Sequence, residues 1–338
     1  MELLRIVSML LVMVVHANFR ALPYPTQAEA LEEPVSSLLR FGTESLSIIC
    51  VNTFVLLSGW YGIRFKMNRL LEFLFQVFFF SLLCMSFVYF FDKDSSINLR
   101  RAVNTFLMTG KWNYWFVKSY LCLYLFSPII NTFVENCTRK QFFGILCIFL
   151  PFYFIYGYIT RGAPWFDNGY SGFSFIVIYL IARYISIYRP SFSQYSKWID
   201  LSLYIVFAVI NTIIAFIATR YGHIGTAHKV YQYTSPIVIV QAIFFLLFFS
   251  KLHLKNHFIN WVGISCFSIY LVHSNSYIAG PYYDSIIKGW FYGIHSTTMF
   301  LLKTALFISC IFILSICIDK IRIRLWSIVY NTYERIFK

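Results

Sequence analysis

Apolar runs of roughly 18 to 22 residues recur along nearly the whole 338-residue chain, and they constrain its fold more than any other feature. Each run is long enough to cross about 30 Å of hydrocarbon as an α-helix, which satisfies its own backbone hydrogen bonds inside a membrane. Composition agrees, because 59% of the residues are hydrophobic and only 12% are charged. The sequence therefore predicts an all-α integral membrane protein, a polytopic bundle without a separate soluble domain.

Ten such spans can be placed along the chain, and we treat residues 1–338 as a single transmembrane domain. The predicted spans are residues 3–22, 44–63, 70–91, 113–134, 142–160, 172–189, 199–219, 233–250, 258–279 and 298–319. The longest connections between them contain Pro, Gly and Asn, which favours loops over further spans. These connections are residues 23–43, 92–112 and 280–297.

The net charge of +14 would suggest a nucleic-acid partner in a soluble protein, but Lys and Arg occur here as short clusters between apolar runs. When alternate connections are assigned to opposite sides, one side holds 16 basic and 6 acidic residues, and the other 12 basic and 8 acidic. The first side includes both ends of the chain, from Arg5 to the tail residue Lys338. The positive-inside rule therefore predicts that both termini are cytoplasmic, with a lipid bilayer and no nucleic acid as the partner.

The first predicted helix carries ionisable residues at both of its ends. It reads "ELLRIVSMLLVMVVHAN" from residue 2 to residue 18. Arg5 and His16 lie eleven positions apart, so their side chains share one helix face about 16 Å apart along the axis. A histidine at membrane depth is costly unless it faces a polar cavity, which makes His16 a candidate for function. The alternatives are a histidine satisfied by a neighbouring helix and an arginine that anchors the helix at the interface.

The element Glu2-x-x-Arg5-x10-His16 resembles the opening of membrane acyltransferase family 3. Three later stretches resemble the same family in the same order. They are "NTFVLLSGWYGIRFKMNRLLEF" with Ser58-Gly59 and a basic loop, "YWFVKSYLCLYLFSPIIN" with Trp115, Tyr124 and Pro128, and "FSIYLVHSN" with His273. The chain departs from the family pattern in two ways: Glu2 stands where Asp is commoner, and the basic loop reads Arg64-x-Lys66-x-x-Arg69 instead of a dense Arg run.

This resemblance implies an enzyme that moves an acyl group, usually acetyl, from cytoplasmic acyl-CoA to a hydroxyl of an envelope polysaccharide or lipid-linked glycan. It also implies a multi-pass protein of the inner (cytoplasmic) membrane. Arg64, Lys66 and Arg69 are the expected CoA-binding residues, because phosphates favour several cations. His16 is expected to act as general base or as nucleophile, and the sequence leaves both open. Arg5 is expected to bind a CoA phosphate or to hold Glu2.

Further candidates at the site are Glu2, Ser58, Trp115 and His273, and His273 has an alternative role as a structural hydrogen-bonding group. His253 and His257 have a spacing that suits a metal, but they lie in a basic loop without an acidic partner, so we expect no metal. Aromatic residues in the predicted outer loops around 161–173 and 277–295 are either sugar-stacking faces or an interfacial belt.

Two other functions stay open at this stage. One is an exporter of a glycan or lipid-linked sugar, in which Arg5 and His16 line a substrate path. The other is a non-catalytic membrane scaffold, in which their spacing is a coincidence. A carrier is expected to show two similar halves with broken helices, and no such repeat is evident in the sequence. The acyltransferase is therefore the preferred hypothesis.

Overall fold

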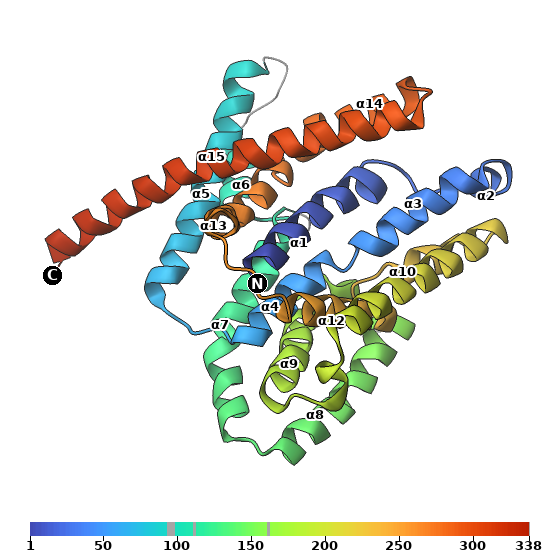
Figure 1. Cartoon of the computed structure of the whole chain (residues 1–338). Coiled ribbons are helices and arrows are strands. Elements are labelled where there is room, and N and C mark those ends of the chain that lie inside the picture. The colour runs from blue at the N-terminus through green and yellow to red at the C-terminus, as the bar shows by residue number, and fades with distance from the viewer. Residues whose placement is uncertain (93–98, 111–112, 161–162, 338) are drawn as a thin grey trace.

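The computed structural model describes residues 1–92, 99–110, 113–160 and 163–337, and all regular elements within these ranges are helices (Figure 1). Lys338, the tail residue that the charge count assigned to the cytoplasmic side, lies outside the described residues. The α-helices are α1 Glu2–Val15, α2 Gln27–Glu32, α3 Pro34–Ser47, α4 Cys50–Tyr61, α5 Met67–Phe91, α6 Leu99–Phe106, α7 Trp115–Asn136, α8 Arg139–Tyr153, α9 Gly172–Tyr188, α10 Lys197–Arg220, α11 Ile224–Val230, α12 Pro236–Ser250, α13 His257–His273, α14 Ser285–Gly293 and α15 Thr297–Phe337. Short π- or 3-10 turns are η1 His16–Arg20, η2 Phe154–Ile159, η3 Asp167–Gly169, η4 Ser191–Gln194 and η5 Ala279–Asp284.

The prediction of a polytopic helical membrane protein is confirmed. Within the described ranges, seven helical stretches are long and apolar enough to cross a membrane. They are Glu2–Arg20, Pro34–Tyr61, Met67–Phe91, Trp115–Asn136, Arg139–Ile159, Lys197–Arg220 and Thr297–Thr332. Helices α9 and α12 are apolar but shorter, and α13 has 17 residues. Each of these ten elements overlaps one of the ten predicted spans, while the span count and the cytoplasmic side of the termini stay predictions.

The three long connections were predicted as loops, and the structure corrects this by placing α2, α6 and α14 within them and by beginning α3 inside the first of them, at Pro34. Of the predicted connection 92–112, residues 93–98 and 111–112 lie outside the described residues. Thr26 and Glu29 form a capping box that starts α2. Pro34 occupies the first turn of α3, where its missing N–H costs nothing, so this proline begins a helix.

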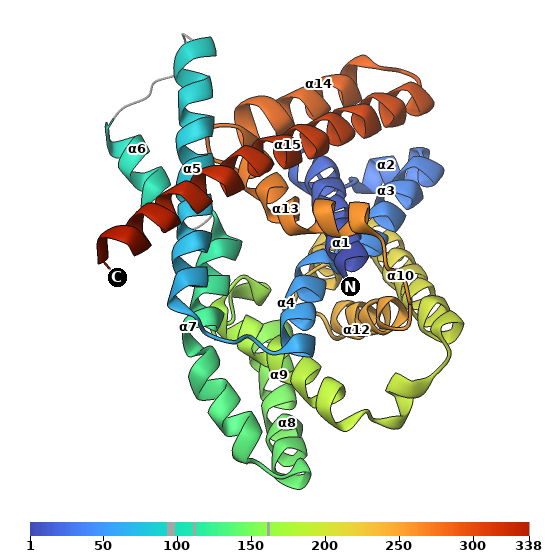
Figure 2. The ribbon, with the colours of Figure 1, turned by 60° about the vertical axis from the view of Figure 1, so that its left-hand side comes forward.

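Helix α1 packs against α13, α3 and α4, so the first helix is surrounded by later parts of the chain (Figure 2). Helix α4 in turn packs closely on α9. A Cβ atom on Gly59 would lie 2.6 Å from the backbone oxygen of Tyr179 and 2.7 Å from Cβ of Ala182. Glycine after Ser58 is therefore required by the close approach of these two helices.

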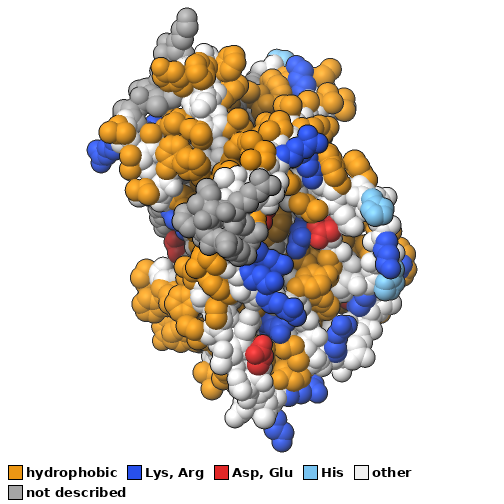
Figure 3. Space-filling view, turned by 90° about the vertical axis from the view of Figure 1, so that its left-hand side faces the viewer, with side chains coloured by type: hydrophobic (Ala, Val, Ile, Leu, Met, Phe, Trp, Pro, Cys, Tyr) orange, Lys and Arg blue, Asp and Glu red, His pale blue; other side chains and the backbone are white. Residues whose placement is uncertain are grey.

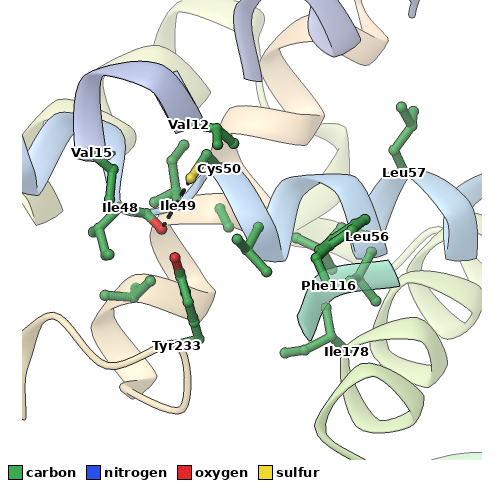
Figure 4. Close-up of a cluster of buried hydrophobic side chains, with 14 of the residues drawn as sticks. Val12, Val15, Ile48, Ile49, Cys50, Leu56, Leu57, Phe116, Ile178 and Tyr233 are labelled. Carbon is green, nitrogen blue, oxygen red and sulfur yellow. Dashed lines mark hydrogen bonds between the residues drawn. The ribbon is translucent and has the colours of Figure 1, made fainter. Parts of the chain in front are cut away.

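Buried apolar side chains fill the space where α1 meets the junction of α3 and α4 (Figure 4). Val12 and Val15 of α1 face Ile48 and Cys50 there, and the ring of Tyr233 approaches from the chain before α12. His16 directly follows Val15, so this packing fixes the position of His16 along the axis of α1 relative to α4.

Many large hydrophobic side chains are exposed on the described helices, as expected for helices that face lipid. Figure 3 shows the face that includes α5, α7 and the C-terminal end of α15, where a run of Lys and Arg side chains lies between hydrophobic areas. The turn between α4 and α5, with the predicted basic loop, belongs to this side of the molecule (Figure 1).

Candidate active site

The acidic and basic residues at the start of α1 form an ion pair. Nη1 of Arg5 donates to both carboxylate oxygens of Glu2, at 2.8 and 3.0 Å. Helix α13 passes directly beside this pair, because a Cβ atom on Gly263 would lie 2.5 Å from Oε2 of Glu2. The Arg5 side chain stays 43% exposed and lines a cavity. Glu2 therefore holds Arg5 at the mouth of that cavity.

This inner cavity has a volume of about 330 Å³ and lies between α1, α4, α5 and α7. Its walls include the three guanidinium groups of Arg5, Arg64 and Arg69 and the hydroxyl-bearing residue Ser58. The remaining lining residues are Leu57, Tyr61, Gly62, Ile63, Leu70, Phe73, Tyr120 and Tyr124. Among the described residues, the ion pairs include neither Arg64 nor Arg69. Such guanidinium groups favour an anion, above all a phosphate.

The basic loop after α4 is held in place by hydrogen bonds from other helices. The hydroxyl of Tyr124 accepts from the backbone N–H of Lys66 at 3.0 Å and donates to the carbonyl oxygen of the same residue at 3.1 Å. Nδ2 of Asn131 donates to the carbonyl of Ile63 at 2.6 Å. Lys66 is absent from the residues that line the inner cavity, so of the three predicted loop cations the structure brings only Arg64 and Arg69 together with Arg5.

A second, narrow cavity of about 30 Å³ continues along α1 from Met9 to His16. Its walls are apolar or aromatic except at His16, and Trp115 at the start of α7 is part of them. The ring of Phe73 in the inner cavity stacks on Phe267 of this middle cavity, with centroids 5.3 Å apart. One turn of α4, from Leu57 to Phe54, also separates the two cavities. An aromatic layer thus divides the basic end of the site from His16.

The two predicted intramembrane histidines are in contact. Nδ1 of His16 lies 2.9 Å from Nε2 of His273, and Nδ1 of His273 lies 2.6 Å from the carbonyl oxygen of Ile269. A carbonyl oxygen only accepts, so Nδ1 of His273 carries a proton and the Nε2 atom of the neutral ring is an acceptor. Paired with His273, Nδ1 of His16 donates and Nε2 is the basic atom; paired with Nη1 of Arg20, which only donates, Nδ1 accepts instead. The two contacts are alternative states of the ring, and the first of them leaves the Nε2 lone pair available.

Arg20, on the π-helical turn after His16, is a further charged residue of the site. Its Nη1 lies 2.9 Å from Nδ1 of His16. Its Nε and Nη2 donate to Oδ1 of Asp284, at 3.1 and 2.9 Å. Burial raises the pKa of the Asp284 carboxyl above its ordinary value, and the positive charge of Arg20 opposes that rise. The Arg20–Asp284 ion pair therefore ties η1 to η5 beside the histidines.

Beyond His16 the structure opens into an outer cavity of about 560 Å³. Trp115, Tyr170 and Tyr233 form one aromatic wall, with ring centroids 4.5 to 5.9 Å apart. His16, Arg20 and Glu44 contribute the ionisable groups. The other lining residues are Val15, Phe19, Tyr24, Ile48, Asn113, Tyr231, Tyr270, Ser274, Ser276, Ala279 and Gly280.

Sequence reasoning missed Arg20, Glu44 and Asp284. Arg20 lies four positions after His16, a spacing that could have signalled a shared face, but nothing local indicates Asp284 or Glu44 as neighbours of His16. Of the aromatic residues in the predicted outer loops, Tyr170 lines the outer cavity. Tyr283 instead packs on His273, with ring centroids 5.3 Å apart. Across the described ranges no group of three or more His, Cys, Asp or Glu residues is arranged to hold a metal ion.

Comparison with known proteins gives one match. A family model described as an acyltransferase domain matches residues 1–319, which is nearly the whole chain. No curated protein and no solved structure matches the chain. The matched range contains α1 to α14 and α15 as far as Asp319, and so includes the residues that line all three cavities.

Proposed function

The chain belongs to acyltransferase family 3 and is a membrane acyltransferase, and we propose that it transfers an acyl group, expected to be acetyl, from cytoplasmic acyl-CoA to a hydroxyl of an envelope polysaccharide or lipid-linked glycan. The protein is then a component of the inner (cytoplasmic) membrane. Family membership supports this hypothesis over the glycan exporter, which has no support of its own.

One observation carries the proposal: three cavities follow one another along α1, with guanidinium groups at one end and the histidine pair at the other. The nucleotide phosphates of CoA fit the inner cavity, where Arg5, Arg64 and Arg69 meet. Arg5 and His16 are about 16 Å apart along the helix, a distance that the extended pantetheine arm covers. The middle cavity holds about 30 Å³ of open space, so its aromatic walls must separate for the arm to pass.

At the far end of this path, Nε2 of His16 takes the proton of the acceptor hydroxyl. The hydroxyl oxygen forms a bond to the thioester carbonyl carbon, the carbon–sulfur bond breaks, and the CoA thiolate leaves and takes up a proton. In the two-step alternative, Nε2 itself attacks the carbonyl and passes the acyl group to the hydroxyl. His273 positions the ring in both routes, and Arg20 supplies positive charge for the oxyanion that forms.

The proposal is tested first by donor binding, which needs no acceptor. The detergent-purified protein is titrated with acetyl-CoA while its thermal unfolding is followed, because a ligand at 100 times its Kd stabilises the folded state by about 2.7 kcal/mol. We expect Arg64→Ala and Arg69→Ala to lose this stabilisation and His16→Ala to keep it. Lys66→Ala is the matched control, since it removes a charge from the same loop but not from the cavity wall.

Two results would reject the donor. One is a folded wild-type protein that millimolar acetyl-CoA does not stabilise. The other is equal loss of stabilisation in Lys66→Ala and Arg69→Ala, which would reflect loop charge in general and not the inner cavity.

A further inference from the structure

A buried carboxyl group in the outer cavity has no role in the steps above. Glu44 belongs to α3, has a relative exposure of 2%, and lines the outer cavity together with His16. Its Oε2 atom accepts a hydrogen bond from Nδ2 of Asn18 at 3.0 Å. In the described part of the chain no lysine, arginine or histidine pairs with it.

Such a carboxyl is an unusual structural element. A buried acidic group is unfavourable unless its oxygens are paired or hydrogen-bonded. Nδ2 of Asn18 divides its contacts between Glu44 and the carbonyl of Arg40, at 3.0 Å each. Within the described ranges, Oε1 of Glu44 has no hydrogen-bond donor from the protein. Glu44 therefore keeps a free acceptor oxygen in the wall of the outer cavity, where a ligand that carries a hydrogen-bond donor can reach it.

A second polar atom on the same cavity is also unsatisfied. Nδ2 of Asn113 donates to the carbonyl of Asn104 at 3.0 Å, but Oδ1 of Asn113 is buried with no partner among the described residues. Asn113 lines the cavity together with Glu44, and Trp115 adds a flat apolar face to the same wall. Arg20 lines the same cavity and disfavours a cationic ligand.

These groups together match a neutral ring that carries several hydroxyls, a pyranoside. We propose that Glu44, held by Asn18, accepts a hydrogen bond from a second hydroxyl of the acceptor, next to the hydroxyl that His16 deprotonates. This inference rests on the proposed function, since it assigns the outer cavity to the acceptor. It makes Glu44 a specificity-determining residue: acceptors with neighbouring hydroxyls bind, and rings without hydroxyls do not.

The test measures binding calorimetrically with the full chain in lipid nanodiscs and two probes. The first probe is n-octyl β-D-glucopyranoside below its critical micelle concentration, and the second is 2-octyloxytetrahydropyran, the same ring and tail without hydroxyls. We expect wild type to prefer the glucoside and Glu44→Ala to bind it roughly tenfold more weakly, the effect of losing one hydrogen bond to a buried polar group. Glu33→Ala, a carboxylate removed from an exposed position just before α3, is expected to bind as wild type does.

Glu44→Gln guards against loss of the fold. Because Glu44 has no ion pair in the described structure, the isosteric amide is expected to keep or raise the unfolding temperature while it weakens glucoside binding. The proposal is overturned if wild type binds the two probes equally, or if both Glu44 variants bind the glucoside as wild type does.

Acetyl-CoA stabilisation of the same preparations separates this inference from the proposed function. If acetyl-CoA stabilises the protein but glucoside binding does not depend on Glu44, the donor half of the function stands and the Glu44 assignment falls. If glucoside binding depends on Glu44 but acetyl-CoA has no effect, the outer cavity is a glycoside site and the donor is wrong. If neither ligand binds, both proposals fall.

Discussion

Nδ1 of His16 lies 2.9 Å from Nε2 of His273, although 257 positions separate the two residues in the chain. The carbonyl of Ile269, one turn earlier on α13, fixes the proton on the far side of the His273 ring. In the tautomer that this contact favours, Nδ1 of His16 donates and Nε2 is the basic atom, whereas Nη1 of Arg20, which only donates, competes for the same Nδ1. This relationship gives the first prediction.

We expect His273→Phe to lower kcat for acyl transfer by roughly 10²-fold, because His16 loses the acceptor that orients its ring. The KM for acetyl-CoA is expected to be unchanged, since His273 is not part of the wall of the inner cavity. The measurement is CoA thiol release in native membranes, which supply the acceptor. A fall in thermal stability together with a matching rise in KM would assign His273 to the fold alone.

The middle cavity gives the second prediction. Val51 lines it, so Val51→Phe fills a space that holds only about 30 Å³. We expect acetyl-CoA still to stabilise this variant, because the inner cavity is untouched, while acyl transfer falls at least roughly tenfold through misplacement of the reacting groups. Val35→Phe is the control, because Val35 is 69% exposed on α3. Transfer at the wild-type rate in Val51→Phe would exclude this path for the acyl group.

The close approach of α13 to Glu2 gives the third. Gly263→Val places a side chain where Oε2 of Glu2 lies, so either the Glu2–Arg5 ion pair or the helix packing must shift. Overpacking of this kind costs about 1 to 3 kcal/mol of unfolding free energy. We expect a lower unfolding temperature and weaker acetyl-CoA binding in the same variant. Gly289→Val serves as the comparison, because a Cβ atom added at Gly289 would meet nothing within 4 Å.

The Arg20–Asp284 ion pair gives the fourth. Asp284→Asn keeps the size of the side chain but removes the charge that holds Arg20 beside His16. We expect transfer to fall roughly tenfold, in line with an oxyanion donor that is displaced but not removed, and Arg20→Ala to lower it by roughly 10²-fold. The double variant should fall no further than Arg20→Ala, because Asp284 acts through Arg20. Additive losses would mean that the two residues act separately.

Sequence alone was sufficient for the membrane class and for the family, while the predicted site residues stay predictions. The predicted span pattern groups Arg5, Arg64 and Arg69 on one side of a bilayer, and the structure brings the three together in the wall of the inner cavity. The sequence did not reveal that Lys66, unlike Arg64 and Arg69, is absent from the wall of the inner cavity. The conformation of this loop depends on hydrogen bonds with Tyr124 and Asn131, which belong to a different helix.

The sequence by itself determined the features that depend on neighbouring residues in the chain. Apolar runs define the helices, and the eleven-position spacing puts Arg5 and His16 on one face of the first helix. What only the tertiary structure decided is which polar groups meet inside the bundle. In a membrane-spanning protein, nearly every helix is apolar around its whole circumference, so local pattern does not reveal which face looks inward. The contacts of His16 with His273, of Arg20 with Asp284 and of Asn18 with Glu44 come from helix packing, because each joins residues from different segments.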